Sequence, residues 1–462
     1  MTKQRILFFT LLLFSSCKDI KPKQVVVLKP DVEYLHDAEK KLTDVIITDI
    51  FSPPVASRVY VYPLLAAYEA GRFSSDVSRQ PAAISKNTFP ADSLKLIADS
   101  YSSITNQLKG FDKMPQPDSS KQYDFTVASI KAFCTVAPKV IFAVRDITDF
   151  ETQTLNALKT RSTDEVFNRS VTFGQQVADV IIKRLSTDNY KETRGMSRFE
   201  VKNDIPGRWI PTPPDYADGI EPHWAEMKTL VMDSAAQCCP APPPSYSENK
   251  SSTFWKATQE VYDISKKMTD EQESIITFWD DNPFVSRHKG HLMFQDKKMT
   301  PGGHWLAIAQ LFLKDKNADF PTALKTYALT SIAMYDAFIS CFCEKYHSAV
   351  VRPETVISAK IDKQWHPNLV TPAFPSYTSG HSTVSASAAE VLTRLFGDNQ
   401  KFTDTTEKEF GLPVRSFTSF RQAAREASIS RVYAGIHYRF DCDKGNEQGT
   451  KVSVLIGEKL KF

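Results

Sequence analysis

The chain has 462 residues, of which 42% are hydrophobic and 24% are charged, with a formal net charge of +3. This hydrophobic content is enough for a sizeable core, and the nearly balanced charge argues against a nucleic-acid partner. Length alone suggests about three domains. No linker rich in glycine or serine and no repeat divides the sequence, however, so we interpret it as one large unit.

Residues 1–17 have the pattern of a targeting segment. Lys3 and Arg5 precede an apolar run over residues 6–14, which is too short to span a membrane, and small residues then lead to Cys17. The pattern resembles a bacterial lipoprotein signal peptide, in which Cys17 becomes the lipidated first residue, and residues 18–33 follow as a tether. We therefore predict an exported protein of the periplasm or cell envelope, attached to the membrane only through a lipid at Cys17. No later stretch is predicted to span a membrane.

Helical periodicity dominates from Tyr34 onward, and alternating strand patterns are scarce. Apolar side chains recur every three or four residues at Leu42, Val45, Ile46 and Ile50. The same spacing predicts a long central helix through Ala323, Leu324, Tyr327, Ala328, Ile332 and Tyr335. Asp336 falls among the apolar positions of that helix and needs a partner if it is buried, so we expect it to have a structural role.

Three blocks of residues in the last third of the chain point to chemistry. In the first block, Lys345 and Arg352 are cations seven residues apart, and Pro353 favours an extended conformation at Arg352. Taken alone, this block is interpreted as a solvated loop.

The second block predicts a loop that leads into the N-terminus of a helix. Residues 374–382 read Phe-Pro-Ser-Tyr-Thr-Ser-Gly-His-Ser, and an apolar helical pattern then runs to Gly397. Ser379, Gly380 and His381 therefore lie where unpaired backbone N–H groups and the positive end of the helix dipole attract an anion. Gly380 allows close approach to the backbone. The alternative is a serine-capped helix with an incidental histidine.

The third block places Arg431 six residues before His437 and Asp441 four residues after it. If the chain is helical beyond Gly435, the Asp441 carboxylate accepts one imidazole N–H of His437 and leaves the other ring nitrogen free. The planar guanidinium of Arg431 suits a tetrahedral oxyanion. A surface helix pair is the alternative for this block alone. Combined, the three blocks offer cations, neutral donors and two histidines for chemistry at an oxyanion.

In this order and spacing, the blocks resemble the signature of the type 2 phosphatidic acid phosphatase and vanadium haloperoxidase superfamily. The signature consists of lysine, six residues and arginine-proline; proline-serine-glycine-histidine; and serine-arginine, five residues, histidine, three residues and aspartate. Thr378 departs from it, because the family has proline there. The ending of residues 437–441, His-Tyr-Arg-Phe-Asp, is similar to that of soluble haloperoxidases. The blocks at residues 278–281 and 301–305 are similar to those of bacterial haloperoxidase-like proteins.

The resemblance implies an all-α fold of two packed helical bundles. We expect an N-terminal helical half over residues 34–250 and a catalytic half over residues 251–462, with the active site inside the C-terminal bundle. It also implies a vanadate-dependent haloperoxidase, which oxidises halide with hydrogen peroxide in the presence of a small organic acceptor. We expect iodide or bromide rather than chloride.

Site roles also follow from the resemblance. Vanadate, or phosphate in its place, is expected to be held through a nitrogen of His437, with His381 as the general acid and base. The groups expected to hold its oxygens are those of Lys345, Arg352, Ser379, Gly380 and Arg431.

Three further residues have supporting roles in this interpretation. Asp441 orients His437, and Asp281 orients His381, although an acidic loop is an equal alternative for Asp281. Phe374 matches an aromatic position beside the cofactor that influences halide choice, with a core phenylalanine as the alternative.

Two other functions stay open on sequence grounds. An exported acid phosphatase would use His437 as the nucleophile and His381 to protonate the leaving alcohol. A non-catalytic surface lipoprotein would keep only the fold, and the presence of all seven site residues argues against it. The pairing of the six cysteines after Cys17 and the oligomeric state are not decided by the sequence.

Overall fold

The computed structural model describes residues 28–75, 102–282, 286–289, 292–295 and 298–462. The predicted signal peptide, Cys17 and most of the predicted tether lie outside these residues. The helices of the first half are α1 (Asp31–Asp49), α2 (Pro53–Gly71), η1 (Arg72–Ser75), η3 (Thr105–Gln107), α4 (Phe125–Val136), η4 (Ala137–Lys139), α5 (Val144–Lys159), α6 (Asp164–Leu185), α7 (Tyr190–Thr193) and η5 (Trp224–Glu226).

The second half contains further helices and the short strands of the described chain. These are α8 (Thr253–Lys266), α9 (Asp270–Phe278), β1 (Ser286–Lys289), β2 (Leu292–Gln295), α10 (Pro301–Asp315), α11 (Phe320–Ser348), α12 (Pro353–Lys360), α13 (Gly380–Phe396), β3 (Phe402–Asp404), η6 (Thr406–Phe410), β4 (Arg415–Phe417), α14 (Phe420–Tyr433) and α15 (Arg439–Leu460). In the described residues the strands form two antiparallel pairs, β1 with β2 and β3 with β4.

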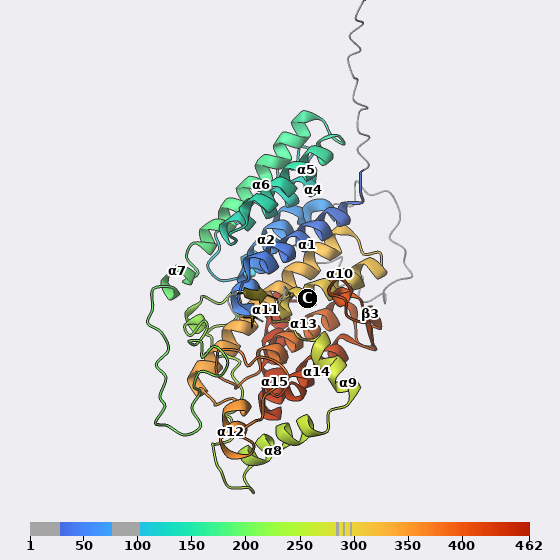
Figure 1. Cartoon of the computed structure of the whole chain (residues 1–462). Helices are drawn as coiled ribbons and strands as arrows, with labels where there is room; N and C mark the ends of the chain where they lie inside the picture. The colour runs from blue at the N-terminus through green and yellow to red at the C-terminus, as the bar shows by residue number, and fades with distance from the viewer. Residues whose placement is uncertain (1–27, 76–101, 283–285, 290–291, 296–297) are drawn as a thin grey trace, which may run out of the picture.

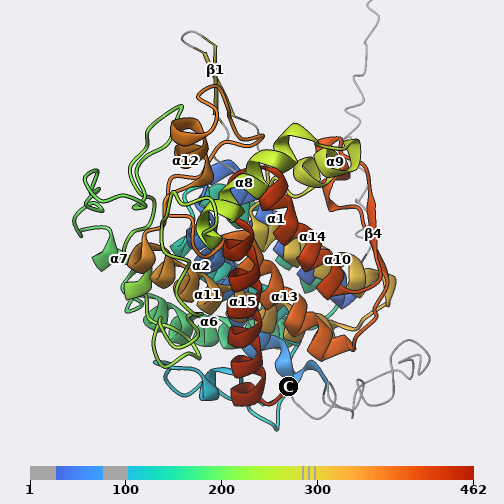
Figure 2. The same ribbon diagram turned by 90° about the horizontal axis from the view of Figure 1, so that it is seen from below.

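The helices are arranged as two packed groups, which confirms the predicted all-α fold. Helices α1, α2, α4, α5 and α6 lie at one end of the molecule, and α13, α14 and α15 lie toward the other (Figure 1). Helix α11 packs against α2 of the first group and against α13 and α15 of the second. Figure 2 shows α11, α13, α14 and α15 gathered side by side. The division at residue 250 stays a prediction.

The central helix α11 is buried along almost its whole length. Its predicted apolar positions all lie inside the core, and Asp319 caps its N-terminus by accepting the Thr322 N–H. By length and hydropathy alone this helix is long and apolar enough to cross a membrane, which the sequence interpretation did not anticipate. In the structure 94% of its apolar window is buried among neighbouring helices, as expected of a core helix.

Asp336 has the structural role expected from the sequence. Its buried carboxylate accepts the backbone N–H groups of Leu230, Val231 and Met232 at 2.8 to 2.9 Å. Burial raises the pKa of this carboxyl group, and the three hydrogen bonds oppose that shift. The contact fixes the segment after η5 to the middle of α11.

Close contact between α13 and α15 brings the second and third sequence blocks together. A Cβ atom on Gly449 of α15 would lie 2.0 Å from the Thr383 carbonyl oxygen of α13, so only glycine fits there. At the N-terminal ends of the two helices, the Ser379 N–H donates to the Asp441 carbonyl oxygen at 3.0 Å. The loop before α13 is thereby held against the start of α15.

The start of α15 differs from the prediction. Gly435 adopts a positive φ of 82°, and the helix begins only at Arg439, so His437 precedes the helix instead of lying on its face. The contact with Asp441 forms nevertheless. The Asp441 carboxylate lies in the first turn and accepts the Tyr438 N–H, and its position at the helix N-terminus also brings it within reach of His437.

Candidate active site

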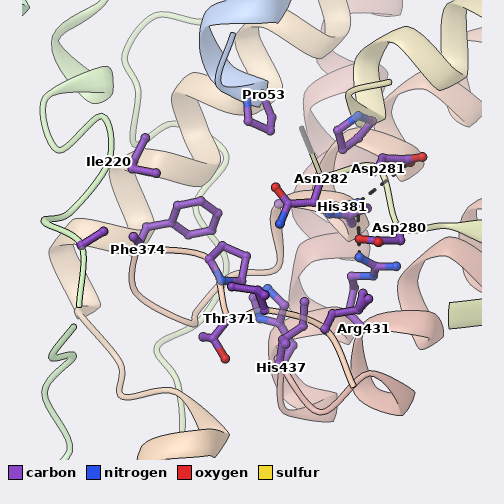
Figure 3. Close-up of a pocket in the computed structure, with 18 of the residues that line it drawn as sticks. Pro53, Ile220, Asp280, Asp281, Asn282, Thr371, Phe374, His381, Arg431 and His437 are labelled. Atoms are coloured by element: carbon purple, nitrogen blue, oxygen red, sulfur yellow. Dashed lines mark hydrogen bonds and ion pairs between the residues drawn. The ribbon is translucent and has the colours of Figure 1, made fainter. Parts of the chain in front are cut away.

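A cavity of about 240 Å³ opens at the ends of α13 and α14 and contains both candidate histidines. Gly380, His381, Arg431 and His437 line one part of it (Figure 3). Asp281 and Phe374 line it as well, together with loops from both halves of the chain. The second and third sequence blocks therefore meet at one hollow.

His437 is buried and has a partner at each ring nitrogen. Its Nδ1 lies 3.0 Å from Asp441 Oδ2, and its Nε2 lies 3.1 Å from Arg352 Nη1. Burial, followed by the charges of Arg352 and Lys345, lowers the pKa of His437 well below 6.5, so the imidazole is neutral at neutral pH. Since a carboxylate can only accept, Nδ1–H donates to Asp441 and Nε2 keeps its lone pair.

Lys345 and Arg352 are fully buried, so the interpretation of their segment as a solvated loop is wrong. Lys345 lies in the last turn of α11 and donates to the carbonyl oxygens of Pro375 and Ser376. Arg352 has the extended conformation predicted from Pro353. Both cations lie close to Phe374, with Lys345 Nζ 4.7 Å and Arg352 Cζ 5.1 Å from its ring centre.

Burial also lowers the pKa values of these cations. It lowers the pKa of Lys345 to about 7 and that of Arg352 to about 10. Arg431, on the last turn of α14, is buried as well, and its pKa is lowered for the same reason. An anion beside these groups would restore the proton on Lys345, because an opposite charge favours the charged form.

His381 lies at the start of α13 and faces the cavity. Its Nε2 lies 3.5 Å from Arg431 Nη1 and 3.9 Å from Asp281 Oδ2, and 16% of the side chain is exposed. Burial and then the charge of Arg431 lower its pKa well below 6.5, so it is neutral and can accept a proton.

Ser379 and Gly380 form the helix start predicted from the sequence. Ser379 is the N-cap of α13, and its Oγ accepts the Ser382 N–H at 3.3 Å. A Cβ atom added to Gly380 would meet no atom within 4 Å. Gly380 also lines the cavity, so a ligand can approach the backbone at the positive end of this helix.

Asp281 belongs to a buried network that the sequence did not reveal. Its Oδ1 lies 2.9 Å from His304 Nδ1, and His304 Nε2 lies 3.0 Å from Asp404 Oδ2. His304 is completely buried and stacks on the Trp279 ring, with 4.7 Å between ring centres. Burial lowers the pKa of His304, but Asp281 and Asp404 outweigh it and raise the pKa well above 6.5. The resulting imidazolium holds Asp281 beside His381.

We expect His304→Ala to destabilise the fold by about 3 to 5 kcal/mol, because the buried carboxylates of Asp281 and Asp404 lose the cation between them. Urea unfolding measures the difference. The control His366→Ala removes an exposed imidazole and should change stability by less than about 0.5 kcal/mol. A loss no larger than that of the control would show that His304 is not charged in the fold.

The same variant should show a defined pH dependence. A raised pKa in the folded chain stabilises it fully below pH 6.5, the ordinary histidine pKa, and this contribution is lost as pH rises through the folded pKa. The stability difference between wild type and His304→Ala should therefore shrink toward alkaline pH.

Ser376 is a second site residue, after His304, that the sequence motifs did not indicate. Its Oγ donates to Asp441 Oδ2 and lies 3.4 Å from His437 Nδ1. Thr378, which replaces the proline of the family pattern, donates to Gln448 Oε1 at 2.6 Å and so fixes the loop to α15. Ser376 could have been suspected from its place in the second block, and His304 from the block at residues 301–305. Asp404 had no such signal, since it lies 100 residues from His304 along the chain.

The charges of the site suit an oxyanion bound to a histidine. Within the described part of the chain, no carboxylate oxygen lies within 4.0 Å of the nitrogen atoms of Lys345, Arg352 or Arg431. Lys345 donates to the carbonyl oxygens of Pro375 and Ser376. Arg352 donates to the carbonyl oxygens of Phe374, Ile436 and Pro372, and Arg431 donates to Ser430 Oγ and the Trp279 carbonyl oxygen. Buried cations without counter-ions are costly, so an anion is expected beside them. The open space at Gly380 and the lone pair of His437 Nε2 lie on the same cavity, and the residues present therefore fit vanadate or phosphate.

Comparison with known proteins places the chain among relatives of similar length. A family model described as the VCPO second helical-bundle domain matches residues 325–461. The crystal structure of the first bacterial vanadium-dependent iodoperoxidase is similar over 92% of this chain and 96% of that chain, with 42% identity and a TM-score of 0.81.

Two further structures, of a bacterial vanadium-dependent chloroperoxidase, share the fold with a TM-score of 0.63 and 16% identity. The holo and apo forms match over 89% of this chain and over 93% and 94% of their own chains. A comparison with curated proteins found no match.

Proposed function

The chain belongs to the vanadium-dependent haloperoxidase family, and on this basis we propose that it oxidises iodide with hydrogen peroxide at the site around His437. The observation on which the proposal rests is the group of three buried cations, with no described carboxylate oxygen within 4.0 Å of their nitrogen atoms, beside a neutral histidine. The preference for iodide is supported by the 42% identity to a bacterial iodoperoxidase over almost the whole chain.

The site residues would have different roles, which follow from their positions. His437 Nε2 would hold the metal of vanadate, while Arg352, Lys345, Arg431 and the Gly380 N–H would hold its negative oxygens, with Ser379 behind them. When bound, vanadate would activate hydrogen peroxide toward attack by halide. Asp441 keeps His437 in the tautomer with an unprotonated Nε2.

His381 would move the proton in this reaction. It is neutral and faces the cavity, so it can take a proton from hydrogen peroxide and return it to the departing oxygen. Arg431 Nη1 and Asp281 Oδ2 both approach its Nε2, at 3.5 and 3.9 Å, and would set its orientation. Asp281 thus acts through His381 and does not itself need to contact substrate.

Triiodide formation from iodide and hydrogen peroxide tests the proposed function. Protein loaded with vanadate should form triiodide, and added phosphate should slow the reaction by competing for the three cations. The same preparation should be assayed with an activated phosphate monoester. Efficient ester hydrolysis without vanadium-dependent triiodide formation would contradict the proposal and favour a phosphatase with His437 as nucleophile.

Export and lipid attachment at Cys17 form a separate proposal. The charged start, the short apolar run and the small residues before Cys17 support it. Mass spectrometry of the N-terminal peptide from membrane fractions would show a diacylglyceryl cysteine. An unmodified peptide that begins at Met1 would contradict both export and attachment.

A further inference from the structure

We propose that the cavity beside His381 and His437 binds the organic acceptor itself, as a neutral molecule built on one apolar ring. The inference rests on the proposed function, because the oxidised halogen must form beside His437. Halogen transfer to carbon would then take place inside the cavity, before the oxidised halogen reaches bulk solvent. The size, the lining and the charge of the cavity each support this occupant.

The cavity is larger than halide and peroxide require. Its volume is about 240 Å³, whereas an apolar cavity of about 150 Å³ is enough to bind benzene. One substituted ring therefore fits next to the cofactor site. The walls come from segments far apart in the sequence, including the start of α2, the loop around Ile220 and residues 369–374.

Most of the lining is apolar. Ile220 and Phe374 lie across the hollow from His381 and Asp281 (Figure 3). Further apolar side chains of the wall are Phe338, Phe342, Leu369, Val370 and Ile436. Prolines at the start of α2 and in the loops at residues 213–214 and 372 restrict the backbone around the hollow. A preformed apolar pocket with a few polar groups at one side is the usual form of a small-molecule site.

The charges favour a neutral ring over a carboxylate. Lys345 and Arg352 do not line the cavity, and their charges would be balanced by the oxyanion held beside His437. Arg431 does line it, but its guanidinium is held by Ser430 and Trp279 and would face the oxyanion. Asp280 and Asp281 lie on the same side, so a second anion would meet negative charge on that side.

Iodination of the acceptor needs only the reactants of the proposed function, iodide and hydrogen peroxide. Iodide, hydrogen peroxide and one proton give hypoiodous acid and water. A ring carbon then attacks the iodine atom, so that a C–I bond forms and the I–O bond breaks. The displaced hydroxide combines with the proton lost from the same carbon to give water. An acceptor seated in the cavity meets hypoiodous acid where it forms, which raises its effective concentration.

Binding is tested on vanadate-loaded protein without peroxide. Without vanadate, the cations Lys345, Arg352 and Arg431 would themselves attract a carboxylate. Two probes built on the same methylated ring, neutral 4-methylphenol and anionic 4-methylbenzoate, are compared by saturation-transfer NMR. We expect the neutral probe to bind at least about tenfold more tightly. Ile220→Trp, which fills the hollow, should weaken binding of 4-methylphenol about tenfold, and Val370→Trp at the rim should do the same if the first variant does not fold. Val454→Trp, on the exposed face of α15, is the matched control and should change nothing.

Turnover supplies the second readout. The ratio of kcat/KM for 4-methylphenol iodination to kcat/KM for triiodide formation should fall about tenfold in Ile220→Trp or Val370→Trp and stay constant in Val454→Trp. Normal triiodide formation with a constant ratio in both filling variants, or equal binding of the two probes, would overturn the cavity as the acceptor site. Absence of triiodide formation in wild type would instead overturn the proposed function.

Discussion

His437→Ala is expected to abolish both vanadate binding and triiodide formation. The substitution removes Nε2, the unprotonated ring nitrogen proposed to hold the metal, and leaves Arg352 Nη1 without its histidine partner. The three cations alone would attract an oxyanion but would not hold its metal. Elemental analysis of vanadium per chain after incubation with vanadate and desalting measures the binding, and triiodide formation measures turnover.

A matched control separates this effect from unfolding. His366→Ala removes an exposed histidine and should keep both vanadium content and turnover. Circular dichroism should be the same for both variants, because Asp441 keeps its contacts with Ser376 and the Tyr438 N–H after His437 is truncated. Stoichiometric vanadium with normal turnover in His437→Ala would show that the metal is held elsewhere.

His381→Ala should separate binding from turnover. The variant keeps His437 and the buried cations, so most of the vanadate should remain bound, while the rate of triiodide formation should fall by about two to four orders of magnitude. Vanadium content and kcat/KM are measured on one preparation. Loss of vanadium equal to that in His437→Ala would reverse the roles of the two histidines.

The pH profile gives a further readout for His381. Burial and Arg431 lower its pKa, so the wild-type rate should fall only when pH drops well below 6.5 and the imidazole becomes protonated. This acidic limb should disappear in His381→Ala. A limb that persists unchanged would assign the titration to another group.

The functional motifs could be recognised from the sequence because each depends on local spacing. The helix start at Ser379, the helix end before Gly397 and the extended conformation of Arg352 all follow from residues within a few positions of one another. The central helix and the structural role of Asp336 were predictable for the same reason, since periodicity shows which positions face a core. Local signals of this kind also carried the family resemblance.

Tertiary packing decided what local spacing does not encode. Lys345 is buried on α11, which packs between two groups of helices, and Arg352 is buried at the start of α12. Burial removes both cations from water, so an oxyanion beside them would balance their charge. The chain of contacts from Asp281 through His304 to Asp404 joins residues up to 123 positions apart (281 to 404). The apolar wall facing His381 also comes from distant loops. The sequence by itself determined which groups can do the chemistry, and only the fold determined their charge states and the shape of the space beside them, because both depend on neighbours brought together by long-range packing.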